Sequence, residues 1–467
     1  MELPISFAQR MKALLGAEYD AFEEALLCED AVKGLRVNRH KVATEVFEKY
    51  TPFDLKKLPY AKDGFIVSEE AQAGKHPYHH AGVYYMQDPG AMATVSALPD
   101  ELWSRKGLKV LDLCAAPGGK TTQIASGIVS LGGAVLANEY NTARSRILAS
   151  NVERMGLDNV CVTNADTKYI AEWYPSFFDL VVVDAPCSGE GMFRKNELAI
   201  SEWSPENVVT SAARQREILA NGAKCLAPGG YLLYSTCTYS VEENEQIIAD
   251  FLSAHPAFHL CPCHDAVAAC TADGVELPDR QGIELSLCRR FYPHRSPGEG
   301  QFVALLRREE EGETRKLVKD ALLPISKQER GIADAFLAET CGPLGGLCLC
   351  GGTVSAFPVR EEMDFPIPPF GVVSVGAALG TVQKGRMIPH HHFFMAYGTG
   401  FASRLILEPD EDAVVRYLAG EEIACEATLH GFTALLLRLG ETAVTLGGGK
   451  ASGGRLKNYY PKGLRVR

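Results

Sequence analysis

Apolar and polar positions between residues 109 and 306 alternate with two different periods. Short apolar runs are typical of buried strands, and they occur at 109–113, 133–138, 160–163, 180–183, 231–234 and 302–306. Between them, apolar residues recur at helical spacing in segments that begin at 122 and cover 143–155 and 206–226. Strands alternating with helices predict a parallel sheet covered by helices. We therefore expect a central α/β domain with its ligand site at the carboxyl ends of the strands.

The segments on either side of this domain carry different patterns. Apolar residues at 7–27 have helical spacing, and in GLRVNRHKV (34–42) Leu35 and Val37 alternate with Arg36, Asn38 and Arg39. The second pattern predicts an amphipathic strand with a basic outer face, either solvated or touching nucleic acid. Near the end, 434–437 and 443–446 predict strands. The expected units are 1–72 (α+β), 73–308 (α/β), 309–380 (a linker or exposed helix at 309–320, then a small module) and 381–467 (mostly β).

The composition is that of a water-soluble globular protein, with 46% hydrophobic and 22% charged residues. No apolar run approaches the ~20 residues that a membrane helix needs, and the first residues lack the pattern of a signal peptide. The 14 cysteines have no regular spacing, which in a chain without an export signal indicates a reducing compartment. We expect the cytoplasm.

The net charge of −11 argues against a protein that holds nucleic acid by its overall charge. Two segments are locally basic. One contains Arg289, Arg290, His294, Arg295, Arg307 and Arg308, and the other contains Lys450, Arg455, Lys457, Lys462, Arg465 and Arg467 with Tyr459 and Tyr460. Basic residues interleaved with aromatic ones are typical of sites for single-stranded or loop RNA, although a solvated tail has the same composition.

Polar residues follow four of the predicted strands. The first strand runs into a Gly-rich turn (Cys114, Ala115, Ala116, Pro117, Gly118, Gly119, Lys120), and the next three end in Glu139, Asp166 and Asp184. Such an ordered set predicts a site for a nucleoside-containing cofactor. The turn is not a dinucleotide fingerprint, because Ala116-Pro117 stands where that motif has a glycine, and it is not a P-loop, which needs four residues between its first glycine and its Gly-Lys pair. S-adenosylmethionine fits, with its ribose at Glu139, its adenine at Asp166 and its methionine part in the turn.

Two cysteines also stand at strand ends. Cys187 follows Asp184-Ala185-Pro186, and Cys237 lies in Ser-Thr-Cys-Thr after the next strand and just before a capping-box pattern, Ser240-x-x-Glu243. Neighbouring strand ends would place both thiols and Asp184 at one pocket. A thiolate that adds to C6 of cytosine makes C5 nucleophilic. Asp184 would then act as the acid near N3, and Lys120 is either a cation that supports the thiolate or an ordinary helix lysine.

Other site classes have weaker support. Cys261, Cys263, His264 and Cys270 lack the paired C-x-x-C spacing of a zinc site, so we expect no metal. His390-His391-His392 precede two phenylalanines and are expected to lie in a loop and core.

Four motifs together resemble one enzyme family. CAAPGGKT (114–121), DAPCSGEG (184–191), STCTYS (235–240) and YPHR…GEGQF (292–302) resemble the Nol1/Nop2/Sun family of RNA cytosine-5 methyltransferases, in the family's order. Within it the chain is most similar to bacterial 16S rRNA methyltransferases of the RsmF (YebU) type. The resemblance implies a Rossmann-like class I methyltransferase domain, a small N-terminal domain and a C-terminal PUA-like RNA-binding domain.

The resemblance also implies a role for each site residue. Cys237 would be the nucleophile, Cys187 would assist release of the product, and Asp184 and Lys120 would complete the catalytic set. The 114–120 turn with Glu139, Asp166 and Asp184 would bind S-adenosylmethionine. The expected partner is RNA, 16S rRNA or the small ribosomal subunit, bound by a monomer. A tRNA substrate, a non-catalytic ribosome-assembly factor and a small-molecule methyltransferase remain alternatives.

Overall fold

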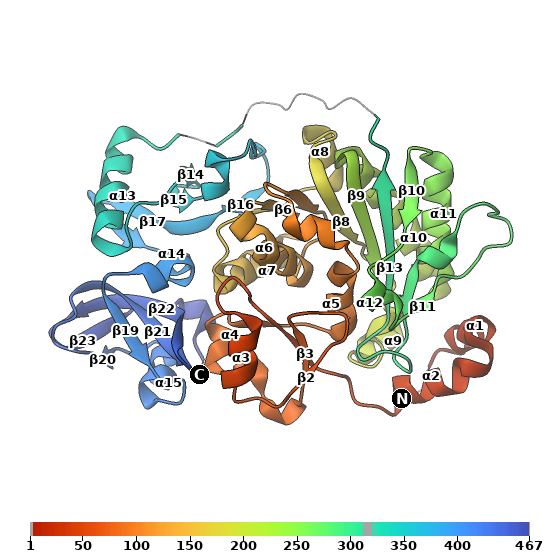
Figure 1. Ribbon diagram of the computed structural model, residues 1–467, viewed down its shortest axis with the longest axis horizontal. Helices are drawn as coiled ribbons and strands as arrows, with labels where there is room; N and C mark the ends of the chain where they lie inside the picture. The colour runs from red at the N-terminus through yellow and green to blue at the C-terminus, as the bar shows by residue number, and fades with distance from the viewer. Residues whose placement is uncertain (1–2, 312–319, 323, 467) are drawn as a thin grey trace.

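The structure is a computed structural model that describes residues 3–311, 320–322 and 324–466. Most of the expected linker at 309–320 and the basic residue Arg467 lie outside the described residues. A large central sheet is flanked by a small N-terminal sheet, drawn in red and orange, and by two C-terminal sheets, drawn in cyan and blue (Figure 1).

The central sheet has the strand order β11-β12-β13-β9-β8-β5-β6-β7-β16, and β10 also pairs with β13. Strands β9, β8, β5, β6 and β7 run parallel, whereas β13 is antiparallel to β9. This confirms the predicted α/β domain. The strands are β5 (Lys109–Asp112), β6 (Ala134–Asn138), β7 (Val160–Thr163), β8 (Phe178–Asp184), β9 (Leu226–Thr236), β10 (Phe258–Cys261), β11 (Ala272–Asp273), β12 (Arg289–Phe291), β13 (Gln301–Arg308) and β16 (Val372–Val375).

Helices cover both faces of this sheet. One face packs on α5 (Pro89–Ser96), α6 (Gly119–Ile128) and α7 (Thr142–Met155), and the other on α8 (Thr167–Trp173), α10 (Pro205–Cys225) and α11 (Glu245–Ala254). Strand β8 feeds both cores, because Leu180 and Val182 belong to the first and Val181 and Val183 to the second. Burial on both faces explains why such a strand is a continuous apolar run. Two shorter helices are α9 (Glu197–Glu202) and α12 (Asp265–Ala268).

The N-terminal region forms two separate parts. The helices α1 (Ile5–Leu15) and α2 (Tyr19–Leu27) pack through Phe7 and Phe22 on Tyr239, which follows the predicted nucleophile motif. A four-stranded sheet, in the order β2-β3-β1-β4, follows. It extends past residue 72, because its strands are β1 (Gly34–Val37), β2 (Leu55–Lys57), β3 (Gly64–Val67) and β4 (Tyr84–Met86), with α3 (Thr44–Tyr50) and α4 (Pro77–His80) beside them.

The expected basic outer face of residues 35–39 is wrong for Arg36. Its side chain is fully buried, although Arg39 is exposed. Arg36 Nε donates to Gln87 Oε1 at 2.9 Å, and Nη2 donates to Thr122 Oγ1 at 2.8 Å and to the carbonyl of Gly119 at 3.3 Å. An alternating pattern cannot tell a face that meets water from one that meets a polar surface of the same protein. Arg36 therefore ties the N-terminal sheet to the start of α6.

The C-terminal half forms two sheets of its own and adds one strand to the central sheet. One sheet consists of β14 (Leu347–Cys350), β15 (Thr353–Ala356), β17 (Ala377–Gln383) and β18 (Arg386–Pro389), so the expected boundary at 380 falls within β17. Strand β16 instead pairs antiparallel with β7 at the edge of the central sheet. The last sheet contains β19 (Arg404–Leu407), β20 (Ile423–Ala424), β21 (Gly431–Leu439), β22 (Thr442–Ser452) and β23 (Arg455–Asn458); the helices are α13 (Lys327–Thr340), α14 (His391–Tyr397) and α15 (Asp412–Ala419).

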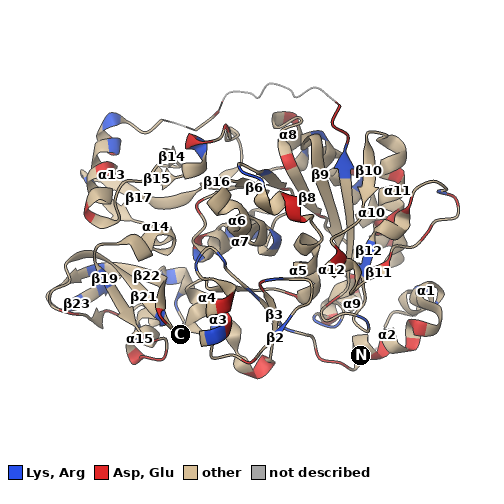
Figure 2. Cartoon of the chain, viewed as in Figure 1, with Lys and Arg blue, Asp and Glu red and all other residues tan. Residues whose placement is uncertain are grey.

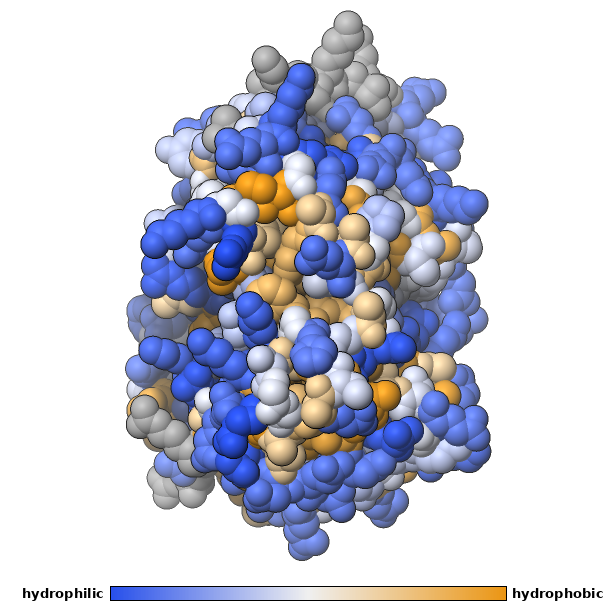
Figure 3. Space-filling view, turned by 90° about the vertical axis from the view of Figure 1, so that its left-hand side faces the viewer, coloured by the Kyte–Doolittle hydropathy of each residue, from blue (hydrophilic) through white to orange (hydrophobic). Residues whose placement is uncertain are grey.

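Helix α14 joins this half to the central domain. His392 Nε2 lies 3.1 Å from the carbonyl of Leu157, and Tyr397 Oη donates to Asp158 Oδ2 at 2.8 Å. His391 and His392 are both buried, which agrees with the expected core position of this segment. The side of the molecule formed by the C-terminal elements is hydrophilic at its edges and more apolar at its centre (Figure 3).

Candidate active site

The ends of β8 and β9 bring the two predicted cysteines into contact. Asp184 and Ser235 are register partners on these parallel strands, so the loops that leave both strands start side by side. The Sγ atoms of Cys187 and Cys237 are 3.2 Å apart. The two thiols are therefore in contact, as expected for loops that leave neighbouring strands, but of the two only Cys237 lines the cavity described below.

Asp184 and Lys120 form an ion pair beside these thiols. Lys120 Nζ lies 2.8 Å from Asp184 Oδ2, and Ser235 Oγ donates to Asp184 Oδ1 at 2.7 Å. The Lys120 side chain is 9% exposed, which an ordinary first-turn helix lysine is not. The geometry therefore favours the reading of Lys120 as part of the site.

A cavity of about 260 Å³ opens between these residues and the Gly-rich turn. Its wall includes Cys237, Asp184, Lys120 and most of the turn, namely Cys114, Ala115, Ala116, Pro117 and Gly119. Gly118 has φ 113° at the N-cap of α6, a conformation that favours glycine. Two further segments also line it, namely 85–88, which includes the end of β4, and 299–301, which belongs to the GEGQF motif and reaches the start of β13.

Asp112, at the end of β5, is a further cavity residue that the sequence reasoning missed. Its Oδ2 accepts a hydrogen bond from Thr121 Oγ1 at 2.6 Å, whereas its buried Oδ1 has no partner among the described residues. Burial raises the pKa of Asp112 to about 7. An unpaired buried carboxylate oxygen in a cavity wall is suited to a cationic group. The ammonium and sulfonium of S-adenosylmethionine fit this requirement.

Glu139 and Asp166 stand at the predicted strand ends but do not line this cavity. Glu139 is 5% exposed, and its Oε1 accepts a hydrogen bond from the backbone N–H of Asn141 at 2.9 Å. Asp166 is exposed and caps α8 through the N–H of Lys168 at 2.9 Å. Their cofactor contacts stay predictions.

The environment of Cys187 favours its protonated form. Contact with Cys237 and burial raise the pKa of the Cys187 thiol well above its ordinary value, and the Glu243 carboxyl raises it further. Of the two thiols, Cys237 is the one that lines the cavity. The Cys237 sulfur is therefore accessible to a ligand in the cavity, and the Cys187 sulfur is in contact with it.

The expected capping box at Ser240-x-x-Glu243 is wrong. Ser240 Oγ donates to Glu190 Oε1 at 2.6 Å, and the helix α11 begins only at Glu245. Glu243 is fully buried and accepts a hydrogen bond from the N–H of Ser188, the residue after Cys187, at 2.9 Å. Burial raises the pKa of Glu243 to about 7. The motif marks a tertiary contact with the other thiol-bearing loop, which local spacing cannot reveal.

The expected basic patch between 289 and 308 is also wrong, because its cations are paired within the protein. Arg290 Nε lies 2.6 Å from Glu245 Oε1, and both His294 Nε2 (3.0 Å) and Arg295 Nε (2.7 Å) meet Glu18 Oε2. The other members, Arg289, Arg307 and Arg308, also face acceptors. Acidic partners come from distant segments, and Figure 2 shows both signs interspersed along the chain.

The C-terminal basic segment keeps part of its predicted character. Lys450, Lys457 and Lys462 are exposed, but Tyr460 is 3% exposed and its Oη lies 3.1 Å from His80 Nδ1. Tyr460 is therefore a packing residue rather than a platform for a base, while Tyr459 is half-buried. Within the described ranges, no helix is long and apolar enough to span a bilayer.

Comparisons with known proteins agree with this geometry. Family models match residues 3–89 (N-terminal domain of 16S rRNA methyltransferase RsmF), 101–307 (16S rRNA methyltransferase RsmB/F) and 404–466 (methyltransferase RsmF PUA domain). The ribosomal RNA small subunit methyltransferase F of Aeromonas hydrophila is 32% identical over 99% of this chain and 97% of its own. That of Klebsiella pneumoniae is 30% identical over 99% and 96%.

A solved structure extends the similarity. A methyltransferase homolog protein from Pyrococcus horikoshii superposes with a TM-score of 0.55 and 28% identity, over 65% of this chain and 94% of its own. Near-complete coverage by relatives of one kind, together with three matching family models, decides the assignment. The chain belongs to the RsmB/F family of 16S rRNA methyltransferases.

Proposed function

We propose that this protein methylates C5 of one cytosine in 16S rRNA through a covalent bond between Cys237 Sγ and C6 of the ring. The observation that carries the proposal is the contact of the Cys187 and Cys237 sulfurs, 3.2 Å apart, at a cavity that also holds the Asp184–Lys120 pair. The substrate follows from the relatives, which are named as small-subunit ribosomal RNA methyltransferases.

Covalent attack answers the low nucleophilicity of C5. When the Cys237 thiolate bonds to C6, the electron pair of the C5–C6 double bond moves toward C5 and N3. The enzymes of this family use S-adenosylmethionine, which when bound supplies the methyl group as an electrophilic sulfonium. Asp112 and the 114–120 turn, with Glu139 and Asp166 at the neighbouring strand ends, are the residues that would hold it. The target base must leave its stack to reach such a cavity.

Asp184 and Lys120 stabilise the charge that the attack creates. Their ion pair places a proton donor and a positive charge beside Cys237 at the cavity wall. After the attack, the pair supplies a hydrogen bond to the N3 side of the ring.

Cys187 serves release of the methylated base. The C5 proton must leave to water before the C6–S bond breaks, the double bond reforms and Cys237 departs as a thiolate. Because its pKa is raised, Cys187 is held as a thiol, which can donate a hydrogen bond to the departing sulfur and stabilise it. Its sulfur is in contact with the sulfur that must depart.

The PUA-like segment at 404–466, with its exposed lysines, is the proposed second RNA contact. We assign the enzyme to the cytoplasm, where ribosomal subunits assemble, and infer that it acts as a monomer. Gel filtration with light scattering checks the last point, because a dimer would elute with twice the mass of 50.7 kDa.

Methyl transfer from labelled S-adenosylmethionine to 16S rRNA or the small subunit tests the nucleophile. We expect Cys237→Ala to lose activity by three or more orders of magnitude, whereas Cys187→Ala should accumulate a protein–RNA adduct that survives denaturing gel electrophoresis. Cys114→Ala, a third thiol in the same cavity wall, is the matched control and should form no stable adduct. Undiminished transfer by Cys237→Ala would exclude it as the nucleophile.

The substrate is tested separately, in a strain lacking the gene. Bisulfite sequencing should show one 16S rRNA cytosine losing its methyl mark and regaining it when the wild-type gene, but not Cys237→Ala, is restored. Loss of a methyl mark from a tRNA instead would show that tRNA is the substrate. If every mark persisted, the substrate assignment would fail.

A further inference from the structure

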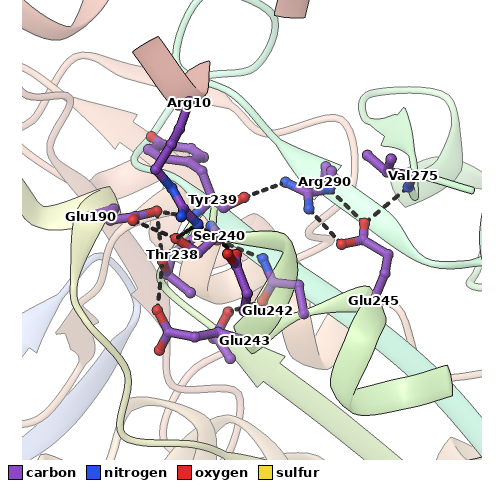
Figure 4. Close-up of polar contacts among 12 residues, drawn as sticks. Arg10, Glu190, Thr238, Tyr239, Ser240, Glu242, Glu243, Glu245, Val275 and Arg290 are labelled. Carbon is purple, nitrogen blue, oxygen red and sulfur yellow. Dashed lines mark hydrogen bonds and ion pairs between the residues drawn. The ribbon is translucent and has the colours of Figure 1, made fainter. Parts of the chain in front are cut away.

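Two buried carboxylates tie together the loops that carry the thiols. Glu190 belongs to the loop of Cys187 yet bonds the loop of Cys237, and Glu243 follows Cys237 yet bonds the loop of Cys187. Glu190 is 1% exposed and Glu243 is fully buried. Figure 4 shows their side chains converging on Thr238, the residue after Cys237. Each carboxylate thus links its own loop to the loop that carries the other cysteine.

Glu243 and its partner Gln215 fix the loop that contains Cys187. Its Oε2 accepts hydrogen bonds from the N–H of Ser188 at 2.9 Å and from Gln215 Nε2 at 2.7 Å, and its Oε1 accepts one from the Ser188 hydroxyl. Gln215 Nε2 also donates to the carbonyl of Pro186 at 3.1 Å. The backbone is thus fixed immediately before and immediately after Cys187.

Glu190 holds the Cys237 loop in the same manner. Its Oε2 accepts hydrogen bonds from Thr238 Oγ1 at 2.7 Å and from the N–H of Tyr239 at 2.8 Å. Its Oε1 accepts one from Ser240 Oγ at 2.6 Å and another from Trp203 Nε1 at 2.9 Å. Glu243 reaches this loop only through Thr238 Oγ1, at 3.2 Å.

The Glu243 carboxylate therefore bonds mainly the loop of Cys187, and the Glu190 carboxylate bonds mainly the loop of Cys237. We propose that Glu243 is the positioning residue for Cys187 in the release step, and that Glu190 is the positioning residue for Cys237 in the attack. Neither carboxylate lines the cavity, so each acts through the cysteine that it holds. The inference rests on the proposed two-cysteine mechanism.

Burial makes these contacts costly to lose. Removing one partner from a buried hydrogen-bonded network leaves donors without acceptors, which is unfavourable, so the loop shifts until those donors find new partners. A shift of about 1 Å in a reacting group is enough to slow a step by about a hundredfold. Loss of Glu243 should displace Cys187, while Glu190 keeps Cys237 in place.

The test measures attack and release separately under single-turnover conditions, with a 16S rRNA substrate and S-adenosylmethionine. Adduct formation is followed by denaturing gel, and release by the appearance of methylated free RNA. For Glu243→Ala we expect adduct formation within about threefold of wild type and release slowed at least thirtyfold, so that adduct accumulates. For Glu190→Ala we expect adduct formation itself to slow at least thirtyfold.

Glu243→Gln is the conservative variant. An amide oxygen accepts from Ser188 N–H and Gln215, and the amide nitrogen donates to the two hydroxyl oxygens, so release should recover to within about threefold of wild type. Gln215→Met is a second route to the same loop, should Glu243→Ala not fold. It removes the bonds to Pro186 and Glu243 and should also accumulate adduct, by at least threefold over wild type.

The outcomes separate this inference from the proposal on which it rests. If Cys187→Ala traps adduct and Glu243→Ala does not, or if Glu243→Ala slows both steps equally, the assignment to Glu243 is overturned. A Glu190→Ala enzyme that attacks at the wild-type rate overturns the assignment to Glu190. If Cys187→Ala itself traps no adduct, the two-cysteine mechanism fails first.

Discussion

Two buried histidines in the C-terminal half should lower the free energy of unfolding of the protein as the pH falls. His391 and His392, on α14, are 5% and 4% exposed. Burial lowers the pKa of both from 6.5 to about 3. His392 places its two ring nitrogens against the carbonyl of Leu157 and the N–H of Ala378, which requires the neutral ring. Protonation therefore favours the unfolded chain, where both rings meet water.

The size of the effect follows from these pKa values. Stability from the neutral rings is complete above pH 6.5, is lost as the pH falls below 6.5, and stops changing below pH 3. At pH 5 each histidine lowers the free energy of unfolding by about 2 kcal/mol, and both together by about 4 kcal/mol. The carboxyls of Asp112 and Glu243, whose pKa values are raised to about 7, act in the opposite direction, so variants must be compared with wild type.

Urea unfolding at pH 7.5 and pH 5 measures the difference. His391→Phe keeps a ring against Tyr460, whose centroid lies 5.2 Å away, and removes one titrating group. We expect the loss of stability between the two pH values to shrink by about 2 kcal/mol relative to wild type. Phe393→Leu, a fully buried neighbour on α14, is the matched control and should lower stability equally at both pH values. An unchanged pH difference in His391→Phe would refute the reasoning.

Two further predictions concern buried cations. Arg36→Met removes the hydrogen bonds to Gln87, Gly119 and Thr122. Calorimetry should then show weaker binding of S-adenosylmethionine, and the free energy of unfolding should fall by about 2–4 kcal/mol. Unaltered binding would show that Arg36 does not support the cofactor turn. Arg290→Met leaves Glu245 buried without its partner and should cost about 3–5 kcal/mol, most of which the double variant with Glu245→Leu should restore; a double variant as unstable as the single one would contradict this.

The sequence was informative where local pattern and tertiary role coincide. Strand β8 is an apolar run because helices cover both of its faces. It ends in Asp184 and leads into Cys187, because a parallel strand delivers its last and next residues to the carboxyl end of the sheet. The adjacency of Cys187 and Cys237 could be predicted for the same reason. The two loops leave strands that are neighbours in the sheet.

The failures share a different cause. Arg36, Glu243 and Arg290 carry charge in stretches that suggest a solvent face, a helix cap and a basic patch, yet each is buried against a partner at least 45 residues away. Charge and spacing along a chain describe what a side chain can do, and they do not say which distant group will meet it. Asp112 was missed because its signal is an oxygen without a partner, which exists only in the folded protein.

The place of β16 has a consequence for how the enzyme measures its substrate. This strand leaves the C-terminal half to pair with β7 in the same sheet whose other strands carry the thiols, and α14 adds the bonds of His392 and Tyr397 to Leu157 and Asp158. These contacts hold the C-terminal half against the catalytic sheet at two separate places. The PUA-like segment follows α14 in the chain and packs on it through β22, so an RNA that touched both this segment and Cys237 would have to match the spacing that the fold sets between them.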